Sequence, residues 1–343
     1  MKKYILLFLL FIFPISVYAS PTIVMDVDSG RILYENSSHS ENLIASTTKI
    51  MTCIIVLENS DIEKEITVGD EILDMVGTNI YISVGEKLKI KDLLYGLMLR
   101  SGNDAAQTLA YNTLGYDDFV NKMNLKAKEI GMNDTIFSNP HGLDDKTNNF
   151  STAYDMALLS RYAYKNKIYR KIISTKKYVT KSNLKSYVWY NRMSLINKYK
   201  KCIGGKNGYT PKAGKSLVSY ATDNNLTLSV ISLDDSEIYE NHEKLYEKYF
   251  SIYKRYLIID KNNFYMNRKY YLKKSFYYPL KEDEIDRVTT LIEIFSTTKN
   301  NMCGKITINL NNKKVGELNI YEKKNKKKKD ISIFQKLKSL FIR

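Results

Sequence analysis

A serine and a lysine stand three positions apart at the head of an apolar segment, IASTTKIMTCIIVLEN, which covers residues 44–59. A serine hydroxyl is a weak nucleophile until a neighbouring base removes its proton. On a helix, Ser46 and Lys49 share one face, so the lysine amine can reach the hydroxyl. Burial among apolar neighbours would favour the neutral amine, and the helix N-terminus would stabilise an oxyanion beside Ser46. The pair therefore predicts acyl transfer by a serine nucleophile, with Lys49 as its base.

This spacing also has a purely structural alternative, in which Ser46 caps the helix and Lys49 extends to the surface. Two further polar blocks favour catalysis. Ser101-Gly102-Asn103 follows about 55 residues after Ser46, and Lys206-Asn207-Gly208 follows about 100 residues after that. Three such blocks in this order are typical of one group of serine acyl-transfer enzymes.

The segments around these blocks predict strands at both ends of a domain and helices between them. Residues 22–36 form two alternating apolar runs around an Asp-Ser-Gly turn, which predicts a β-hairpin. From Ala45 the apolar residues cover every face of a helix, which predicts burial all round. A second helix starts near Asp92, breaks at Ser101-Gly102-Asn103, and gives way to a third helix from about Asp104.

More helical sequence follows around residues 151–166, and residues 202–233 then supply three short β-prone runs. Turns at Pro211 to Gly214 and at Asp223 to Asn225 separate these runs, so Lys206-Asn207-Gly208 lies in a strand. We expect an α/β sandwich, in which helices pack on an antiparallel sheet whose first and last strands pair.

The chain of 343 residues is longer than one compact domain usually is. Helical sequence that ends near Tyr256 closes the first domain. Leu257 to Tyr321 is then tyrosine-rich, alternating and interrupted by turns, and its clearest hairpin bends at Asn311-Asn312. We expect a catalytic domain at residues 20–256 and a small β-rich domain at residues 257–321.

The N-terminus reads as a secretory signal peptide at residues 1–19. Two lysines precede an apolar stretch, and Val17 and Ala19 occupy the small-residue positions before a cut. The alternative is an uncleaved anchor, although the apolar run is shorter than the roughly 20 residues that a bilayer needs. No cysteine follows Ala19 directly, which argues against a lipoprotein. We expect export to the extracytoplasmic face of a bacterial cell membrane.

The C-terminal residues 322–343 concentrate the positive charge. From Lys323 onward, eight lysines and Arg343 stand against Asp330, a net +8 of the whole chain's +16. Apolar residues fall on one side of a helix with lysines opposite, which predicts an amphipathic anchor on an anionic membrane surface. The alternatives are a solvated charged tail or a nucleic-acid-binding tail, and export argues against nucleic acid as a partner.

The cysteines and histidines suggest no metal site, since none stand at ligand spacing. No cofactor or disulfide framework is expected, and Cys53 reads as a small core residue. His39 and His242 lie in polar segments that read as exposed. His141 reads as a loop-shaping residue, which leaves a Ser-His-Asp triad without a histidine.

Several blocks in order resemble one family, the serine-type D-Ala-D-Ala carboxypeptidases, or low-molecular-mass penicillin-binding proteins. The similarity covers much of residues 22–233. It includes VMDVDSGRILYEN, ASTTKIMT, GTNIYISVGEKLKIKDLLYGLMLRSGNDAAQTLA, FSNPHGLDD, STAYDMALL and GGKNGYTPKAG. The resemblance implies a sandwich like those of penicillin-binding proteins and serine β-lactamases, followed by a small all-β domain and a C-terminal amphipathic helix.

The resemblance also implies roles for residues at matching positions. Ser46 would be the acylated nucleophile, Lys49 its general base and Ser101 the hydroxyl that relays a proton to the leaving amine. Asn103 would hold the substrate amide and the Lys49 side chain, and Lys206 would attract the substrate's terminal carboxylate. The backbone N–H groups of Ser46 and Tyr209 would bind the oxyanion. Gly208, which has no side chain, would let the substrate backbone lie against the strand.

Two positions qualify this assignment. The third block of the family usually has threonine where this chain has Asn207, whose amide is longer and lacks a hydroxyl rotor but still donates a hydrogen bond. Arg192, in YNRMSL, matches a block that carries a substrate-proximal arginine, and a surface salt bridge is its alternative role.

The sequence thus predicts an exported DD-carboxypeptidase that removes the terminal D-Ala from peptidoglycan stem pentapeptides and is acylated by β-lactams. One alternative is a catalytically impaired cell-wall or penicillin-binding protein, in which Asn207 has abolished turnover. A β-lactamase is the other, but the second block reads Ser-Gly-Asn rather than Ser-Asp-Asn and no equivalent of the deacylating glutamate stands out.

Overall fold

The first and last strands of the predicted sandwich pair with each other. In the computed structural model, which describes residues 20–264, 269–296 and 300–323, β1 (Thr22–Asp26) runs antiparallel to β11 (Leu226–Ser232). The sheet has the order β2-β1-β11-β10-β9 and is completed by β2 (Ile32–Asn36), β9 (Cys202–Thr210) and β10 (Gly214–Asp223). The strand β9, which carries the Lys206 block, forms one edge of this sheet. The predicted hairpin corresponds to β1 and β2, and the three predicted β runs correspond to β9, β10 and β11, so both predictions are confirmed.

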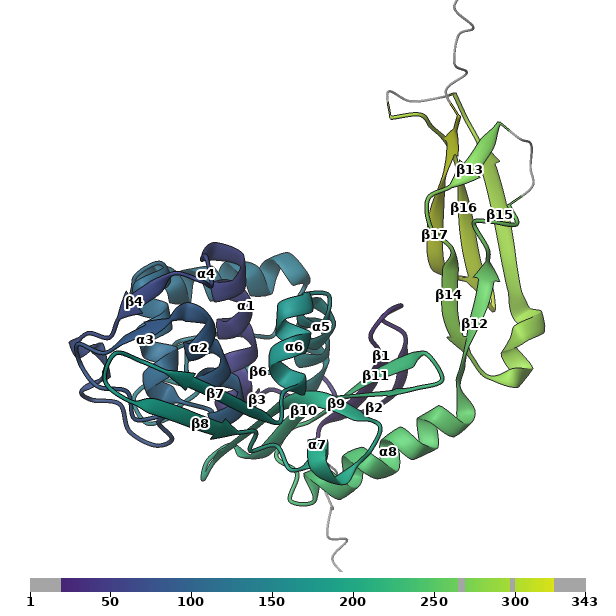
Figure 1. Cartoon of the computed structure of the whole chain (residues 1–343). Coiled ribbons are helices and arrows are strands. Elements are labelled where there is room, and N and C mark those ends of the chain that lie inside the picture. The colour runs from purple at the N-terminus through teal and green to yellow at the C-terminus, as the bar shows by residue number, and fades with distance from the viewer. Residues whose placement is uncertain (1–19, 265–268, 297–299, 324–343) are drawn as a thin grey trace, which may run out of the picture. The chain divides into compact units, whose positions relative to one another are not determined.

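Helices cover both faces of this sheet (Figure 1). Neighbouring residues of β10 show the two faces. Tyr220 donates a hydrogen bond to the Ser160 carbonyl of α5 (Ala153–Tyr164), while Ser219 contacts His242 and Tyr246 of α8 (Ile238–Ile252). The α/β sandwich is therefore confirmed. Its helices are α1 (Lys49–Asn59), α2 (Ile90–Tyr95), α3 (Asn103–Thr113), α4 (Tyr116–Ile130), α5 (Ala153–Tyr164), α6 (Lys167–Ser174), α7 (Leu195–Lys198) and α8 (Ile238–Ile252).

Short turns and hairpins connect these elements. Single-turn helices lie at η1 (Ala45–Thr48) and η2 (Asp70–Ile72), and the π-helical turn η3 (Gly96–Arg100) continues α2. Three two-stranded pairs lie outside the main sheet: β3 (Asn42–Leu43) with β6 (Phe150–Ser151), β4 (Glu65–Thr67) with β5 (Lys87–Lys89), and β7 (Lys177–Lys181) with β8 (Ser186–Tyr190).

The helix α1 is the centre of the core, as its apolar pattern predicts. All residues from Lys49 to Val56 are buried, including Cys53. The three cysteines of the chain are all free and buried, so no disulfide supports the fold. Burial of Ile, Met and Val side chains supplies the driving force that holds this helix between its neighbours.

His242 corrects one expectation from the sequence, because it is fully buried rather than exposed. Its Nδ1 lies 2.7 Å from Ser219 Oγ and its Nε2 lies 3.2 Å from Ser232 Oγ. Burial lowers the pKa of His242 to about 3, so the ring is neutral. The polar segment around it is an amphipathic helix, whose face of Ile238, His242, Tyr246 and Tyr249 packs on the sheet.

The described part of the chain divides into two compact units, with the division after Tyr249. The sequence-based boundary at Tyr256 falls within β12 (Lys254–Ile259) of the second unit. This unit is β-rich, with β13 (Tyr270–Leu272), β14 (Phe276–Leu280), β15 (Val288–Ile294), β16 (Met302–Leu310), β17 (Lys313–Glu322) and the short 3₁₀-helix η4 (Glu282–Arg287). Its four-stranded sheet has the order β13-β17-β16-β15, and β12 pairs with β14.

The small β domain and the bend at Asn311-Asn312 are thus as predicted, since β16 and β17 flank those residues. Ile306, Ile308 and Ile320 lie in the core of this unit. The signal peptide and the C-terminal amphipathic helix lie outside the described residues. Within the described ranges, none of the helices combines the length and the apolar character needed to cross a bilayer.

Candidate active site

The start of α1 brings the serine and lysine of the first block together. Ser46 lies in η1, and Lys49 is the first residue of α1. Lys49 Nζ and Ser46 Oγ are 3.0 Å apart and share a hydrogen bond. Lys49 is completely buried, so its side chain does not extend to the surface. The geometry is that of a nucleophile in contact with a base.

Two further acceptors hold the Lys49 amine in place. Asn103 Oδ1 accepts a hydrogen bond from Nζ at 2.8 Å, and the backbone carbonyl of His141 accepts another. The pKa of Lys49 lies well below its ordinary value, chiefly because burial penalises the ammonium and secondly because of the Lys206 charge, while Asp104 acts in the opposite direction. The amine therefore gains access to its neutral form, which can accept a proton.

The second block lies between η3 and α3. Ser101 ends η3 in the left-handed region, with φ 66°, and Asn103 begins α3. Asn103 Nδ2 donates to the Val76 carbonyl at 2.7 Å, so one amide joins the lysine to the loop before β5. The structure thus brings Asn103 to Lys49 directly, whereas it shows no hydrogen bond from Ser101 Oγ within the described part of the chain.

The third block lies on the edge strand β9, opposite the start of α1. A Cβ built at Gly208 would lie 2.8 Å from the Ser46 nitrogen, so only glycine permits this approach of strand and turn. Asn207 is partly buried, and the Tyr209 side chain is 64% exposed. The backbone of this strand therefore runs directly past the serine, where an acyl oxygen and a substrate backbone would lie.

Lys206 is the second buried cation of the site. Its Nζ donates to the Asn207 carbonyl, and its side chain is almost completely buried. Burial first and the positive charge of Arg192 second lower the pKa of Lys206 to about 7. Arg192 itself is exposed and is anchored by its backbone N–H, which donates to the Leu99 carbonyl at 3.0 Å. The charge of Arg192 thus acts on Lys206.

The loop of residues 139–143 closes the site from the other side. His141 Nδ1 accepts a hydrogen bond from the Leu143 N–H at 3.1 Å, which fits the loop-shaping role predicted for it. Burial first and the Lys49 charge second lower the pKa of His141 to about 3, so the ring is neutral. Gly142 has φ 88°, and a Cβ there would lie 2.0 Å from the Ala45 carbonyl oxygen.

Sequence reasoning missed two supporting residues. Asp104 is buried, and its carboxylate accepts hydrogen bonds from the backbone N–H groups of Ile80 and Ile82. This contact fixes the loop before β5 against α3, so it positions Asn103. Gly142 was missed because its requirement for glycine arises from contact with a segment almost 100 residues away in sequence.

This arrangement of a serine in contact with a buried lysine, an asparagine on a second helix and a lysine on an edge strand defines a class of serine acyl-transfer protein. A family model described as D-alanyl-D-alanine carboxypeptidase matches residues 13–237. Since the match covers well over half of the chain, the chain belongs to the D-alanyl-D-alanine carboxypeptidase family, as the resemblance indicated.

Curated relatives carry the same description. The chain is 33% identical over 215 residues to D-alanyl-D-alanine carboxypeptidase DacF of Bacillus subtilis, a match that covers 61% of this chain and 55% of that protein. It is 32% identical over 204 residues to D-alanyl-D-alanine carboxypeptidase DacB2 of Mycobacterium tuberculosis, covering 59% of this chain and 70% of the relative. The chain thus spans little more than half the length of the Bacillus subtilis protein.

Solved structures agree with the fold. A D-alanyl-D-alanine carboxypeptidase from Mycobacterium tuberculosis superposes with a TM-score of 0.66 at 29% identity, covering 68% of this chain and 91% of that one. Penicillin binding protein 5 from Haemophilus influenzae has a TM-score of 0.74 at 24% identity, covering 91% of this chain and 98% of that one. The second likeness extends the agreement in fold to most of the chain.

Proposed function

We propose that this protein is a serine DD-carboxypeptidase that removes the terminal D-Ala from peptidoglycan stem pentapeptides. The observation that carries the proposal is the buried Lys49 amine in hydrogen-bond contact with Ser46 Oγ at 3.0 Å. Burial lowers the pKa of Lys49, so its neutral amine can take the serine proton without a histidine. The family to which the chain belongs supports this choice of substrate.

Acylation begins when Ser46 Oγ attacks the carbonyl carbon of the penultimate D-Ala. Lys49 Nζ accepts the serine proton, and the carbonyl oxygen becomes an oxyanion. The backbone N–H groups of Ser46 and Tyr209 would stabilise that oxyanion, which fits the close approach of β9 to η1 at Gly208. The oxyanion then collapses and the peptide C–N bond breaks.

The leaving amine needs a proton as that bond breaks. Ser101 would relay the proton from Lys49 to the leaving nitrogen, so that the terminal D-Ala leaves with a neutral amine and Lys49 is neutral again. A water molecule then attacks the carbonyl carbon of the Ser46 ester, and Lys49 accepts a proton of that water. The ester C–O bond breaks, and Lys49 returns the proton to Ser46 Oγ, which restores the serine hydroxyl. Each cycle consumes one water and releases one D-Ala and the shortened peptide.

Substrate recognition would depend on two cations, Lys206 of β9 and the nearby Arg192. Lys206 and Arg192 place positive charge where the substrate's terminal carboxylate would lie, and the Asn207 amide offers a hydrogen bond to the same group. Asn103 would bind the substrate amide while it holds Lys49. β-Lactams present a carboxylate and a reactive carbonyl in a similar arrangement, so they would acylate Ser46 as well.

The test is D-Ala release from Nα,Nε-diacetyl-L-Lys-D-Ala-D-Ala by the mature chain, with Ser46→Ala as the inactive control. We expect release by the wild type and none by Ser46→Ala, together with covalent labelling of the wild type alone by a fluorescent penicillin. Release that persists in Ser46→Ala would overturn the assignment of the nucleophile.

Asn207 favours a second candidate, a cell-wall or penicillin-binding protein with little turnover. Asparagine lacks the hydroxyl that the family usually presents at this point of β9. Asn207→Thr separates the two functions. Penicillin labelling without D-Ala release in the wild type, with release restored in Asn207→Thr, would favour the binding protein. D-Ala release by the wild type, with a rate that Asn207→Thr changes by only about five-fold, would favour the enzyme, because about five-fold corresponds to one hydrogen bond.

The proposal includes export and attachment of the C-terminal residues 322–343 to an anionic membrane surface. Its support is the sequence, with a signal-like N-terminus and a net charge of +8 from Lys323 onward. The full mature chain should sediment with phosphatidylglycerol vesicles and remain in solution with phosphatidylcholine vesicles. A chain truncated after Tyr321 should bind neither, and equal binding by the two chains would rule out the tail as the anchor.

A further inference from the structure

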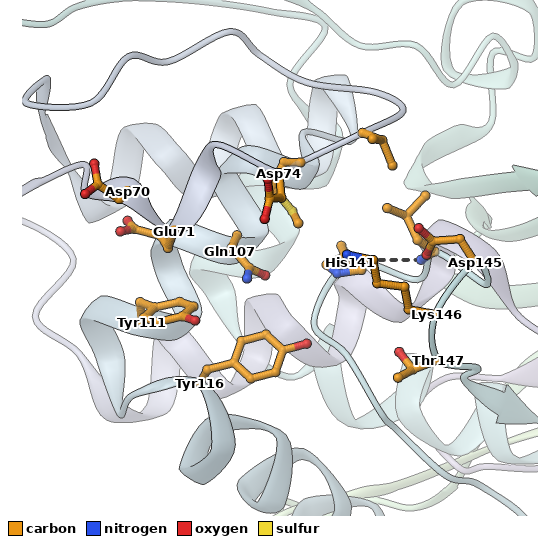
Figure 2. A pocket seen from close by; sticks show the side chains of 13 residues that line it. Asp70, Glu71, Asp74, Gln107, Tyr111, Tyr116, His141, Asp145, Lys146 and Thr147 are labelled. Carbon is orange, nitrogen blue, oxygen red and sulfur yellow. Dashed lines mark hydrogen bonds between the residues drawn. The ribbon is translucent and has the colours of Figure 1, made fainter.

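A pocket of about 390 Å³ lies beside the proposed catalytic centre and shares two walls with it. Figure 2 shows it between the loop after η2, the helix α3 and the loop that carries His141. Val76 and His141 line the pocket, and their backbone carbonyls accept the hydrogen bonds of Asn103 and Lys49. Its volume lies within the range of small-molecule sites.

Gln107 lines this pocket and carries a buried side-chain oxygen without a hydrogen-bond partner. It lies one helical turn after Asn103 on α3, so the two side chains share a face of the helix. Gln107 is 92% buried, and its Oε1 has no hydrogen-bond partner in the described part of the chain. A buried oxygen without a donor costs free energy, and a ligand that donates a hydrogen bond would recover it.

The charge of the pocket is opposite to that of the chain. Four carboxylates line it, against the single cation Lys146, in a protein whose net charge is +16. They come from Asp70, Glu71 and Asp74 on one wall and Asp145 on the other (Figure 2). The neutral His141 ring adds no positive charge to oppose them. The site would therefore attract a cation.

Two aromatic rings in the lining indicate which type of cation the pocket would attract. Tyr111 and Tyr116 line the floor in Figure 2, with ring centroids 5.6 Å apart and planes inclined at 42°. Aromatic faces attract organic ammonium groups. No three carboxylate, imidazole or thiol side chains gather as metal ligands within residues 20–264, 269–296 and 300–323. The lining thus suits an ammonium group rather than a metal ion.

We infer that this pocket, the acidic pocket, binds the primary ammonium group of a peptidoglycan peptide side chain. The ammonium donates to Gln107 Oε1, lies near the carboxylates of Asp70, Asp74 and Asp145, and faces the two tyrosine rings. This inference rests on the proposed function for the choice of a peptide ligand, while the preference for an ammonium follows from the lining. The amine comes from the third residue of the bound stem or from a second peptide strand.

The first experiment compares two substrates that differ only in that charge. Nα-acetyl-L-Lys-D-Ala-D-Ala keeps the ε-ammonium, and Nα,Nε-diacetyl-L-Lys-D-Ala-D-Ala lacks it. We expect wild-type kcat/KM to be about five-fold or more higher for the free amine, within the range of single charge contacts. Gln107→Leu and Asp74→Asn should lose this preference and keep their activity on the diacetyl peptide. Asp286→Asn, an exposed carboxylate of the second unit, is the matched charge control and should keep the preference.

The second experiment reads the pocket without catalysis. Calorimetric titration of pentylammonium into Ser46→Ala should show binding that Gln107→Leu in the same background abolishes. Binding together with a substrate preference assigns the ammonium to the stem itself, and binding without that preference assigns it to a second strand. No preference and no pentylammonium binding would overturn the inference even if D-Ala is released. Binding without any D-Ala release would uphold the pocket and overturn the proposed function.

Discussion

The proposed catalytic centre and the acidic pocket lie side by side in the first unit, yet they use charge in opposite ways. The centre contains two buried lysines, Lys49 and Lys206, whose pKa values are lowered by burial. The carboxylates of the pocket, such as Asp70 and Asp74, are exposed. Burial converts a cation into a base, whereas exposure leaves a carboxylate as a permanent charge that attracts a ligand.

One helix serves both regions. Asn103 and Gln107 stand one turn apart on α3, and the first accepts from a lysine while the second has a free acceptor. The same chemical group, a side-chain amide oxygen, therefore positions a base at one site and is proposed to contact a ligand at the other. The difference lies in what each oxygen contacts, because Asn103 Oδ1 accepts from a buried ammonium of the protein and Gln107 Oε1 has no donor in the described part of the chain.

Replacing the proposed base should have the largest effect on the centre. Lys49→Arg keeps the positive charge but cannot lose its proton near neutral pH, so the rate of penicillin acylation should fall by roughly 10³-fold. Stopped-flow labelling with a fluorescent penicillin measures that rate. Lys89→Arg, at an exposed salt bridge to Glu63, is the matched control and should acylate like the wild type.

Lys49→Met provides a second test in case Lys49→Arg does not fold, because methionine removes the base and fits the apolar surroundings. Both variants should unfold cooperatively and show the same loss. Acylation by either one at more than a tenth of the wild-type rate would mean that another group takes the serine proton.

Gly142→Ala should disturb the two regions together, because its loop forms a wall of each. A Cβ at Gly142 would lie 2.0 Å from the Ala45 carbonyl oxygen, and φ is 88°. We expect the free energy of unfolding, measured in urea, to fall by roughly 2–4 kcal/mol. Gly131→Ala is the matched control, since φ is 87° there and the nearest atom is 3.8 Å away. It should cost about 1 kcal/mol, from backbone strain alone. Equal losses in the two variants would deny the contact with Ala45.

The pH dependence of kcat/KM should show both buried lysines. Lys49 must be neutral to act as a base, so activity should fall on the acid side. Lys206 must be charged to bind the carboxylate and has a pKa lowered to about 7, so activity should fall as the pH rises above that value. Lys206→Arg stays charged, so the alkaline limb should move up by about one pH unit or more. An unchanged alkaline limb would exclude Lys206 as the group responsible.

The lowered pKa of Lys206 also determines whether the free energy of unfolding rises or falls with pH. In the folded chain Lys206 titrates at about 7, and its ordinary value is 10.5. Between these values the unfolded chain binds more protons, so the free energy of unfolding should rise with pH across this window. Relative to Lys206→Met, the wild type should gain stability from pH 7 to pH 10 in urea titrations. A relative loss over that window would contradict a buried lysine with a lowered pKa.

Much of the centre could be predicted from the sequence because its signals are local. The apolar residues after Lys49 predict a buried helix, and the runs on either side of Lys206 predict strands. The pairing of Ser46 with Lys49 follows from helical spacing. The three-block order then places these elements in one family, which the family match supports.

The rest depends on contacts between distant segments. Gln107 reads as an ordinary helix residue, and only the fold shows that it lines one pocket together with Asp74 and Asp145. Gly142 reads as a loop glycine until Ala45 packs against it. His242 was judged exposed from its charged neighbours, although the helical spacing of Ile238 and Tyr246 could have placed it on the buried face.

Salt should produce the smallest effect and should separate the two regions most cleanly. The carboxylates of Asp70, Asp74 and Asp145 are exposed, so raising NaCl from about 0.05 to 0.5 M screens them, since the Debye length falls well below about 10 Å. The preference for the free-amine peptide over the diacetyl peptide should shrink by about two-fold to three-fold. Lys49 is buried among fixed partners, so the rate of penicillin acylation should change little. An acylation rate that falls with salt as steeply as the preference would mean that the centre, too, depends on exposed charge.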